Sequence, residues 1–545
     1  MIVRARFTRA VPGCSEACCS IQFTIETKMD ATPEAVTQKP ELFFGLVAPV
    51  GSDLSRVTDD LKQALTTVAY RCETVHLIEQ IHELEPWKDT PESPLDVRID
   101  KHMDAGNELR HKLDRGDAIA LLGVGAVRKF RGLHHVAAEL PLTEKVQIPV
   151  SNAAYVFRSL KHPDEVRTLR RIYGDAFFLI AGYSPRRTRV EHLAGRIAES
   201  HHHFQLGEYR ADAERLSQRD EAEMDDRLGQ NVRKTFPQAD IFIDTSDPVG
   251  TQQAVQRFVE LVFGHPFHTP TRDEFSMFHA RAAALRSSAL GRQVGAVIAT
   301  KEGDIIAVGS NEVPKAGGGL YWCNDKPDHR DFTLGYDTND AIKLNIIGDF
   351  LKRLSDAGWL NDRQSATAVS DLVKQALSGD HPVLPKTSQV MNLTEFSRTV
   401  HAEMAALSDA ARRGVPVGGD ILYTSTFPCH NCAKHIVAAG IERVVYIEPY
   451  PKSLALDLHL DSIEVEGRGN DTDVNFTPFV GIAPRRYMDL FTAPERKDED
   501  GKTVLWNSLR ALPRFSIPNT YVRNETTQLS QFYSAMDSKD LKVVG

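Results

Sequence analysis

The stretch TFPCHNCAKHIVAAGI, residues 426–441, places two of the chain's seven cysteines, Cys429 and Cys432, three residues apart. Pro428 precedes them and apolar residues follow at helical spacing, so we expect the pair at the start of a helix. Residues at i and i+3 share one helix face, and a helix N-terminus favours the thiolate form of cysteine. The stretch therefore predicts either a metal site or a pair of buried thiols.

A second motif supplies what a metal site still lacks. His401 and Glu403 stand in TVHAEMAALSDAARRG (399–414), a predicted helix that precedes Cys429. The order H-x-E followed by P-C-x-x-C is the signature of zinc-dependent deaminases. A catalytic zinc ion takes three protein ligands and keeps one position open, so we predict that His401, Cys429 and Cys432 bind one Zn²⁺.

Glu403 is not needed as a ligand, but it lies two residues from one. A carboxylate beside activated water can carry protons from the water to a ring nitrogen and then to the leaving amine. We therefore predict Glu403 as the catalytic residue of a hydrolytic deamination. The alternative, a structural zinc finger, needs four protein ligands and gives Glu403 no role.

Residues 275–450 resemble a deoxycytidylate deaminase of the cytidine deaminase superfamily, and the chain is identified as a member of that superfamily. RQVGAVIATKEGDIIAVGSNEVPKAG (292–317) is similar to that family's first strand pair and the following G-x-N-x-x-P loop, and residues 421–450 are similar to its second half. The resemblance implies a cytidine-deaminase-like α/β/α domain in which Asn311 contacts the deoxyribose. Lys315, on the same loop, is a candidate phosphate contact, although any surface lysine would look the same. Asn311 could also serve only to stabilise the turn.

The chain departs from that family in an insertion of about residues 320–395, which we expect to be mostly helical. Within it, Cys323 and His329 could bind a second zinc ion, but only two ligands are visible and a free thiol is the simpler interpretation.

Before the deaminase-like part, apolar segments alternate with helical ones. Segments 42–51, 118–124, 176–182 and 239–244 are predicted strands, and 53–70 has helical spacing. Such alternation is typical of a parallel sheet covered on both faces. A proline-rich connection at 265–272 suggests a domain boundary near residue 268.

The turn after the first predicted strand, GLVAPVGSDL (45–54), lies where a phosphate-binding loop would be expected. Gly45, Gly51, Ser52 and Asp53 are candidate nucleotide-binding residues, because backbone N–H groups at a helix start can bind phosphate. The Walker lysine is absent, which disfavours phosphoryl transfer. Residues 169–193 and 229–248 resemble parts of small P-loop nucleotide kinases, which implies a bound ATP or deoxynucleotide near Arg186, Arg187 and Arg189.

A P-loop-kinase-like domain fused to a deoxycytidylate deaminase resembles the layout of a bacterial anti-phage deaminase family. That resemblance implies conversion of dCMP and dCTP to dUMP and dUTP, depletion of the deoxycytidine nucleotide pool during infection, and restraint by a small regulatory RNA. We accordingly expect an extension at 1–40, a kinase-like domain at 41–268, a deaminase domain at 269–495 and a tail at 496–545.

Composition limits the alternatives. The 545 residues carry a net charge of −9 and no apolar run long enough to span a bilayer, and the cysteines are too few and uneven for a disulfide framework. We therefore expect a cytoplasmic protein without a membrane partner, and a homo-oligomer. A polynucleotide deaminase acting on single-stranded DNA or RNA would need a basic channel, and a zinc-containing regulatory nucleotide-binding protein would not need Glu403. Both remain open as alternatives.

Overall fold

The computed structural model describes residues 39–136, 139–203, 206–223, 226–378, 382–385, 388–450, 452–465 and 472–544. The expected extension at 1–40, with Cys14, Cys18 and Cys19, falls outside them except for residues 39 and 40. From Pro40 onward the chain forms one compact unit, which contains two six-stranded sheets. No helix in the described residues has both the length and the apolar character needed to cross a membrane.

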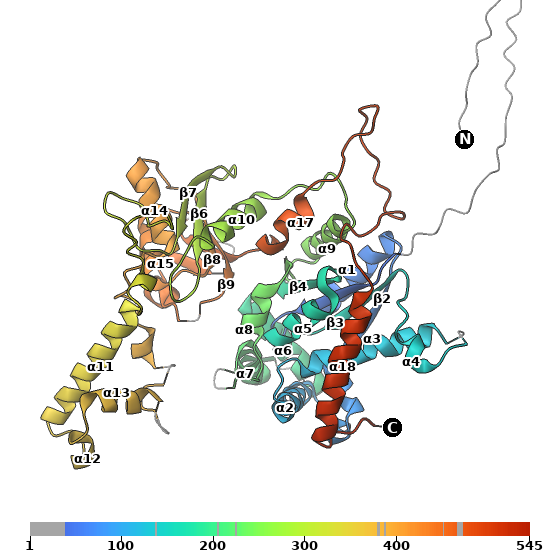
Figure 1. Ribbon diagram of the computed structural model, residues 1–545, viewed down its shortest axis with the longest axis horizontal. Helices are drawn as coiled ribbons and strands as arrows, with labels where there is room; N and C mark the ends of the chain where they lie inside the picture. The colour runs from blue at the N-terminus through green and yellow to red at the C-terminus, as the bar shows by residue number, and fades with distance from the viewer. Residues whose placement is uncertain are drawn as a thin grey trace, which may run out of the picture. The chain divides into compact units, whose positions relative to one another are not determined.

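The first sheet has the strand order β12-β5-β4-β1-β3-β2. Figure 1 labels its strands β2, β3 and β4. Its strands are β1 (Leu42–Val47), β2 (Arg71–His76), β3 (Ala153–Arg158), β4 (Phe177–Tyr183), β5 (Ile241–Asp244) and β12 (Gly481–Ile482). Strands β1 to β5 pair in parallel, and the short β12 is antiparallel to β5. The predicted parallel sheet is confirmed.

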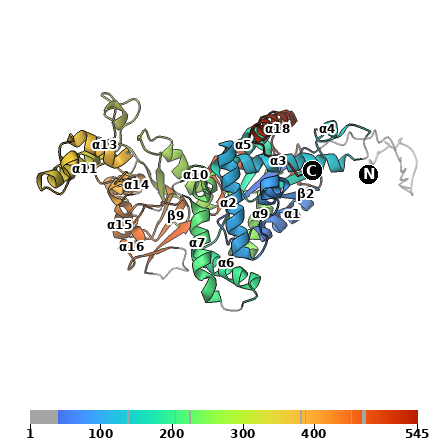
Figure 2. The ribbon, with the colours of Figure 1, turned by 90° about the horizontal axis from the view of Figure 1, so that it is seen from below.

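Apolar clusters cover both faces of this sheet. Along β1, Leu42, Phe44 and Leu46 pack into one cluster, and Phe43 and Val47 pack into the other, as expected of a strand buried on both sides. The helices of this part are α1 (Leu54–Thr67), α2 (Leu95–Leu113), α3 (Ala118–His134), α4 (Leu142–Lys145), α5 (Pro163–Tyr173), α6 (Arg186–Ser200), α7 (Arg210–Glu221), α8 (Val232–Thr235) and α9 (Pro248–Val262). Helices α1 and α9 contact each other over one face, while α3 and α5 lie on the other. Helices α6 and α7 lie side by side (Figure 2).

The strand predicted at 118–124 is wrong, because these residues form the first turns of α3. Ala118 through Val124 are all buried, so the segment is continuously apolar and has neither the period of a helix nor that of a strand. Strands β2 and β3 were not predicted from the sequence. Val75 is the one buried residue of β2, so the sequence of this strand, RCETVH, has little apolar character.

The second sheet has the order β10-β11-β9-β8-β6-β7. Its strands are β6 (Gly295–Ala299), β7 (Ile305–Ser310), β8 (Ile421–Thr426), β9 (Arg443–Glu448), β10 (Ile463–Val465) and β11 (Val474–Pro478). The helices of this part are α10 (Arg272–Ala284), α14 (Ala402–Arg413), α15 (His430–Ala438) and α16 (Ala455–Leu458). Strands β6 and β7 form an antiparallel pair, and β8, β9, β11 and β10 are parallel.

Two glycines let helices approach the β6–β7 pair closely. A Cβ on Gly309 would lie 2.1 Å from the carbonyl oxygen of Ala402, and one on Gly295 would lie 2.0 Å from that of Ala280. The start of α14 can therefore pack directly on β7, and α10 directly on β6.

The insertion is largely helical, as predicted. It contains α11 (Thr338–Asp356), α12 (Asp362–Ser365), α13 (Val369–Ser378) and the 3₁₀ turns η6 (Asp331–Thr333) and η7 (Gln389–Asn392). Helices α11 and α13 pack against each other.

The chain returns to the first sheet after β11. Strand β12 joins β5, and α17 (Tyr487–Phe491) contacts α9. The last helix, α18 (Thr520–Ser538), packs against α3 and α5 (Figure 1). Four of its apolar side chains are buried in the same cluster as α3, namely Tyr521, Leu529, Phe532 and Met536.

Candidate active site

The three predicted metal ligands lie at the starts of two helices. His401 is the residue immediately before α14, and Cys429 is the residue immediately before α15. Cys432 lies in the first turn of α15. Strand β8 ends at Thr426, so the turn from β8 into α15 brings both sulfurs to one end of the second sheet.

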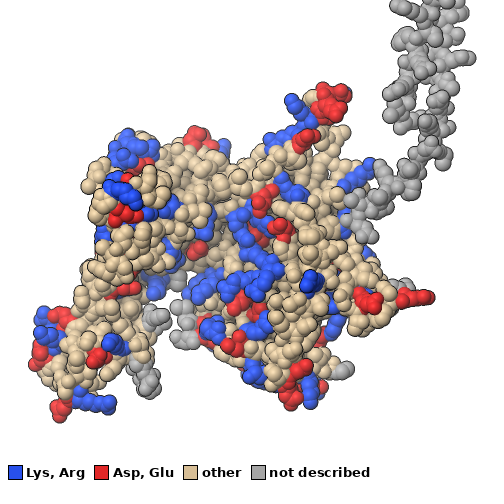
Figure 3. Space-filling model, in the orientation of Figure 1, with Lys and Arg blue, Asp and Glu red and all other residues tan. Residues whose placement is uncertain are grey.

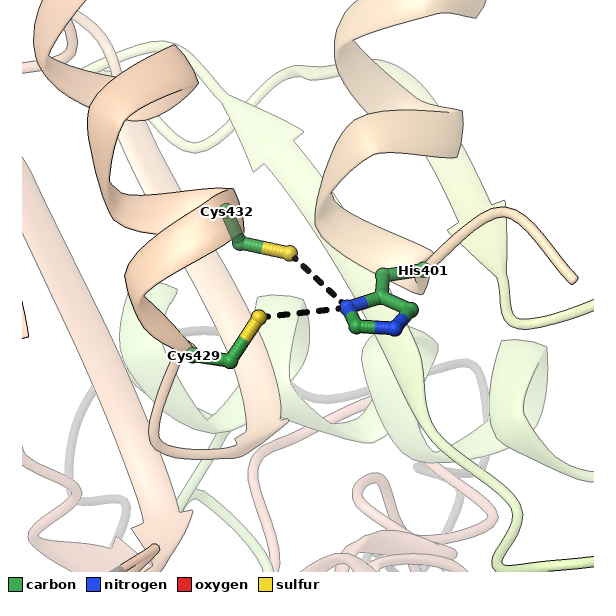
Figure 4. Close-up of side chains that lie close together, drawn as sticks. All are labelled: His401, Cys429 and Cys432. Carbon is green, nitrogen blue, oxygen red and sulfur yellow. Dashed lines mark hydrogen bonds between the residues drawn. The ribbon is translucent and has the colours of Figure 1, made fainter. Parts of the chain in front are cut away.

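These three side chains point toward one another (Figure 4). The His401 Nδ1 atom lies 3.2 Å from the Cys429 sulfur and 3.4 Å from the Cys432 sulfur. Ligand atoms around a tetrahedral zinc ion are separated by about 3.3–3.8 Å at ordinary Zn–N and Zn–S bond lengths. One imidazole and two thiols at these separations fit Zn²⁺, and the three residues form a candidate metal group in the described chain.

The site favours ionisation of one thiol. A hydrogen bond from the Cys432 thiol, assisted by the nearby His401 ring, lowers the pKa of Cys429 to about 4. The hydrogen bond with Cys429 raises the pKa of His401 above its usual range. A negative sulfur beside an imidazole is the environment that a bound cation completes.

Glu403 lies next to this group and is 4% exposed. One carboxylate oxygen is 3.4 Å from the Cys432 sulfur, and the other accepts a hydrogen bond from the Thr424 hydroxyl at 3.4 Å. Burial raises the pKa of Glu403 above that of an ordinary carboxyl. A carboxyl with a raised pKa can both accept and donate a proton near neutral pH.

A cavity of ≈ 400 Å³ opens onto these groups. Its lining includes His401, Glu403 and Cys429, together with the residue that follows β7, residues of the insertion and a residue of the loop after β9. Other polar and aromatic residues of the lining include Arg292, Asn311, Asp331, Asn339, Phe427 and Tyr450. The volume falls in the range of small-molecule sites.

Asn311 lies at the cavity, but backbone groups already engage both ends of its amide. Its Oδ1 accepts from the Val294 N–H at 2.7 Å, and its Nδ2 donates to the Arg292 carbonyl at 2.7 Å. These two hydrogen bonds show that Asn311 stabilises the turn. Contact with a sugar remains a prediction, which would use the second N–H of the amide.

Lys315 does not line the cavity. Its ammonium group lies 2.5 Å from the Asp325 carboxylate, on an exposed part of the loop. The structure therefore does not bring this residue to His401 and Glu403, and phosphate binding by Lys315 remains a prediction.

Arg292 and Tyr450 line the cavity although sequence reasoning did not select them. The Arg292 guanidinium lies 5.2 Å from the Tyr450 ring centre, and one nitrogen is 3.7 Å from Glu448. Arg292 is the first residue of the deaminase-like segment 292–317, and Tyr450 is the last residue of the segment 421–450. These positions were the only feature of the sequence that could have indicated either residue.

The loop after β1 differs in part from the predicted phosphate-binding turn. Gly45 lies inside β1, where a Cβ would come within 2.6 Å of Leu160 and 2.8 Å of Phe177. Packing therefore accounts for this glycine. Gly51 has a left-handed φ of 91°, and a Cβ there would meet the Arg189 carbonyl oxygen at 2.5 Å.

The other two predicted residues lie at the start of α1. Asp53 caps the helix by accepting from the Arg56 N–H at 3.0 Å. The Ser52 hydroxyl is buried, with no hydrogen-bond partner in the described residues. Lys161, which follows β3, donates to the Ala48 carbonyl at 2.9 Å and so brings a lysine to this loop from elsewhere in the chain.

The possible second zinc site in the insertion shows no metal-binding geometry. Cys323 is exposed, and neither it nor His329 belongs to a candidate ligand group in the described part of the chain.

Comparison with known proteins agrees with this geometry. The family model of the cytidine and deoxycytidylate deaminase zinc-binding region matches residues 270–448. The deoxycytidylate deaminase of Enterobacteria phage T2 is 31% identical over 165 residues, which cover 30% of this chain and 71% of that protein. That of phage T4 is 30% identical over 128 residues, covering 23% of this chain and 64% of that protein. A solved structure of the dCMP deaminase from cyanophage S-TIM5 shares 17% identity and covers 39% of this chain and 100% of that chain, at a TM-score of 0.21. The chain therefore belongs to the cytidine and deoxycytidylate deaminase family and is a hydrolytic deaminase with a zinc-binding region.

Proposed function

We propose that this enzyme deaminates free deoxycytidine nucleotides, dCMP, dCTP or both, to their deoxyuridine counterparts. The observation that carries the proposal is the buried carboxyl of Glu403, which shares one cavity with His401 and Cys429 and lies beside the Cys432 sulfur. A structural zinc site would have no need of a buried acid beside it.

In this proposal, three residues bind the zinc ion and a fourth transfers protons. His401, Cys429 and Cys432 would hold the zinc ion, which when bound supplies a Lewis acid that lowers the pKa of water toward about 7. Glu403 would take a proton from the attacking water, protonate the ring nitrogen and then pass a proton to the leaving amine. The reaction forms a C4–O bond, breaks the C4–N bond and releases ammonia.

Three features support a free nucleotide as the substrate. The phage T2 and T4 relatives are named deoxycytidylate deaminases. The cavity has the volume of a small-molecule site, and Arg292 offers it a positive charge. The net charge of −9 disfavours wide contact with a polyanion, while the basic side chains that gather across the middle of the face in Figure 3 would suit the few phosphates of a nucleotide.

The test replaces Glu403 by Gln and measures zinc content and ammonia release together. We expect the Glu403→Gln enzyme to keep its zinc and to lose activity on the order of 10²–10⁴-fold, the usual contribution of a general acid–base group. Cys429→Ser should lose both zinc and activity. Asp409→Asn is a matched control, because Asp409 lies on the same helix α14 and pairs with Arg412.

Substrate class is decided in the same assay with dCMP, dCTP, deoxycytidine and a single-stranded oligonucleotide. Faster turnover of the oligonucleotide than of either nucleotide would refute the proposed substrate. Full activity in the Glu403→Gln enzyme would refute the proposed proton carrier.

We further propose, from the resemblance to anti-phage deaminases, that the enzyme depletes dCTP and dCMP during infection and is restrained by a small RNA. Infected cells that express the wild type should lose deoxycytidine nucleotides, and cells that express Glu403→Gln should not. We also propose that the chain is a cytoplasmic homo-oligomer, supported by the exposed apolar side chains Leu344, Phe350 and Trp359 of the insertion.

We propose that the first sheet forms a nucleotide-binding domain resembling P-loop kinases. The order β2-β3-β1-β4-β5 places the loop after β1 at the carboxyl end of a central strand, where connections leave in opposite directions along the sheet. Ligands of open α/β sheets bind at such points. The α1 start, Lys161 and the unpartnered Ser52 hydroxyl all lie at this loop. The proposed nucleotide-binding domain comprises residues 41–268, strand β12 and the chain from α17 to α18. The proposed deaminase domain runs from residue 269 to the end of β11.

A further inference from the structure

We propose that the described chain has a second metal site, remote in sequence from the deaminase motif, in which His82, Glu92 and His102 bind a zinc ion. His82 belongs to the 3₁₀ turn η1 (Ile78–Glu83) and His102 to α2, while Glu92 lies in the loop that joins these elements. The three side chains form a candidate ligand group.

The ring nitrogens show which atoms are free to bind a cation. The Nδ1 atom of His102 lies 2.7 Å from the Arg98 carbonyl oxygen, and that of His82 lies 3.1 Å from the Lys88 carbonyl oxygen. A carbonyl oxygen can only accept, so each Nδ1 carries a proton. The neutral ring then has its lone pair on Nε2, and metal-binding histidines in proteins are oriented in just this manner.

Both Nε2 atoms converge on one carboxylate oxygen. They are 3.0 Å from each other, and Glu92 Oε1 is 2.8 Å from that of His82 and 3.3 Å from that of His102. Three lone-pair atoms at these distances repel one another unless a positive charge lies among them. Ligand atoms around tetrahedral zinc with N and O donors are about 3.3 Å apart, which is the separation of His102 and Glu92; the other two pairs are closer and would move apart slightly to admit the ion.

Either a metal ion or a proton shared by the rings would supply that positive charge, and the fixed orientation of the rings favours the metal. His102 is 4% exposed, and its Nδ1–H is held by the Arg98 carbonyl, so its Nε2 lone pair is fixed toward the group. A neutral imidazole is the form that binds zinc.

The surroundings also resemble those of a ligand carboxylate. Glu92 Oε2 accepts a hydrogen bond from Arg98 Nε at 2.5 Å, which leaves Oε1 directed at the histidines. The Arg98 charge is itself opposed by Glu79, 3.5 Å away. Glu92 is 54% exposed, so solvent can supply a fourth ligand.

The other histidine–carboxylate group of the described residues lacks this arrangement. In the group of Glu260, His265 and His268, the His265 Nδ1 accepts the Phe267 N–H at 3.3 Å. His268 forms a simple pair with Glu260. This group therefore provides a matched control.

The test counts zinc in the full-length protein after dialysis against excess zinc and then against metal-free buffer. We expect two ions per chain in the wild type and in His268→Gln, and one in His82→Gln and in Glu92→Gln. Both altered side chains are partly exposed, so these variants should fold, and Glu92→Gln should retain deamination because its site is not the one that holds Glu403. Loss of the remaining ion on adding Cys429→Ser to Glu92→Gln would assign each ion to its site.

Anomalous diffraction at the zinc edge gives a second readout that does not depend on a variant. A peak among His82 Nε2, His102 Nε2 and Glu92 Oε1 would support the site. A wild-type protein with one zinc per chain, unchanged in His82→Gln and Glu92→Gln, would overturn it.

Discussion

At the scale of single residues, Arg292 is the one arginine or lysine that the described residues contribute to the cavity lining. Its guanidinium is half-exposed, and its carboxylate neighbour Glu448 is 3.7 Å away. We predict that Arg292→Ala raises KM for dCMP roughly tenfold or more, the effect of losing one charge-assisted hydrogen bond to phosphate. Steady-state kinetics with dCMP and with unphosphorylated deoxycytidine would measure it.

The Arg292→Ala substitution should strongly raise KM for dCMP but not for unphosphorylated deoxycytidine. Lys315→Ala is the comparison, because Lys315 is the other candidate phosphate contact and pairs with Asp325 outside the cavity. An equal loss with deoxycytidine, or a larger loss in Lys315→Ala, would contradict the role of Arg292.

The residues of the candidate site differ in how far the sequence could identify them. His401, Glu403, Cys429 and Cys432 were identifiable because a metal-binding motif fixes residue type and spacing together. Arg292 and Tyr450 were not, because a cavity lining depends on how distant segments meet in space.

At the scale of elements, helix α18 is held by a buried charge. Glu525 on α18 and Glu41 before β1 both contact the Arg131 guanidinium of α3, at 2.6 and 2.8 Å, and all three side chains are fully buried. We predict that Glu525→Gln lowers the free energy of unfolding by about 3 kcal/mol, because a buried charge then loses one of its partners. Urea unfolding would measure it, with the exposed Gln531→Ala on the same helix expected to change stability by less than about 0.5 kcal/mol. Equal stability of the two variants would show that α18 is not anchored by this contact.

The elements were predictable where period and turn signals agreed. Helices α1 and α14 and strands β6, β8 and β9 all follow from the sequence. Helix α3 was mistaken for a strand because its first turns are buried throughout. The packing of α18 on α3 could not be predicted, because Arg131 and Glu525 are 394 positions apart in the sequence and no local pattern encodes such a contact.

At the scale of the whole molecule, the proposed nucleotide site and the zinc centre lie on different sheets. We predict that Ser52→Leu weakens binding of ATP, dCTP or dTTP at least tenfold, because a leucine would fill the space at the start of α1 where the unpartnered hydroxyl lies. Isothermal calorimetry would measure binding, and unchanged zinc content with a normal circular dichroism spectrum would show that the fold is intact. Undiminished binding of all three nucleotides would refute this function of the loop. The effect on deamination can have either sign, since coupling between sites does.

The position of α18 has a consequence for how the protein is made. A ribosome releases β1 and α3 well before α18, so the Arg131 charge has only Glu41 as a partner while the intervening deaminase segment is synthesised. We expect the first sheet to reach its final stability only after α18 has been synthesised, in contrast to the usual order in which N-terminal domains mature first. A chain that stops before α18 would thus expose the face that α18 covers and be a substrate for proteolysis, so that a stable first sheet would exist only in chains that also carry the deaminase segment.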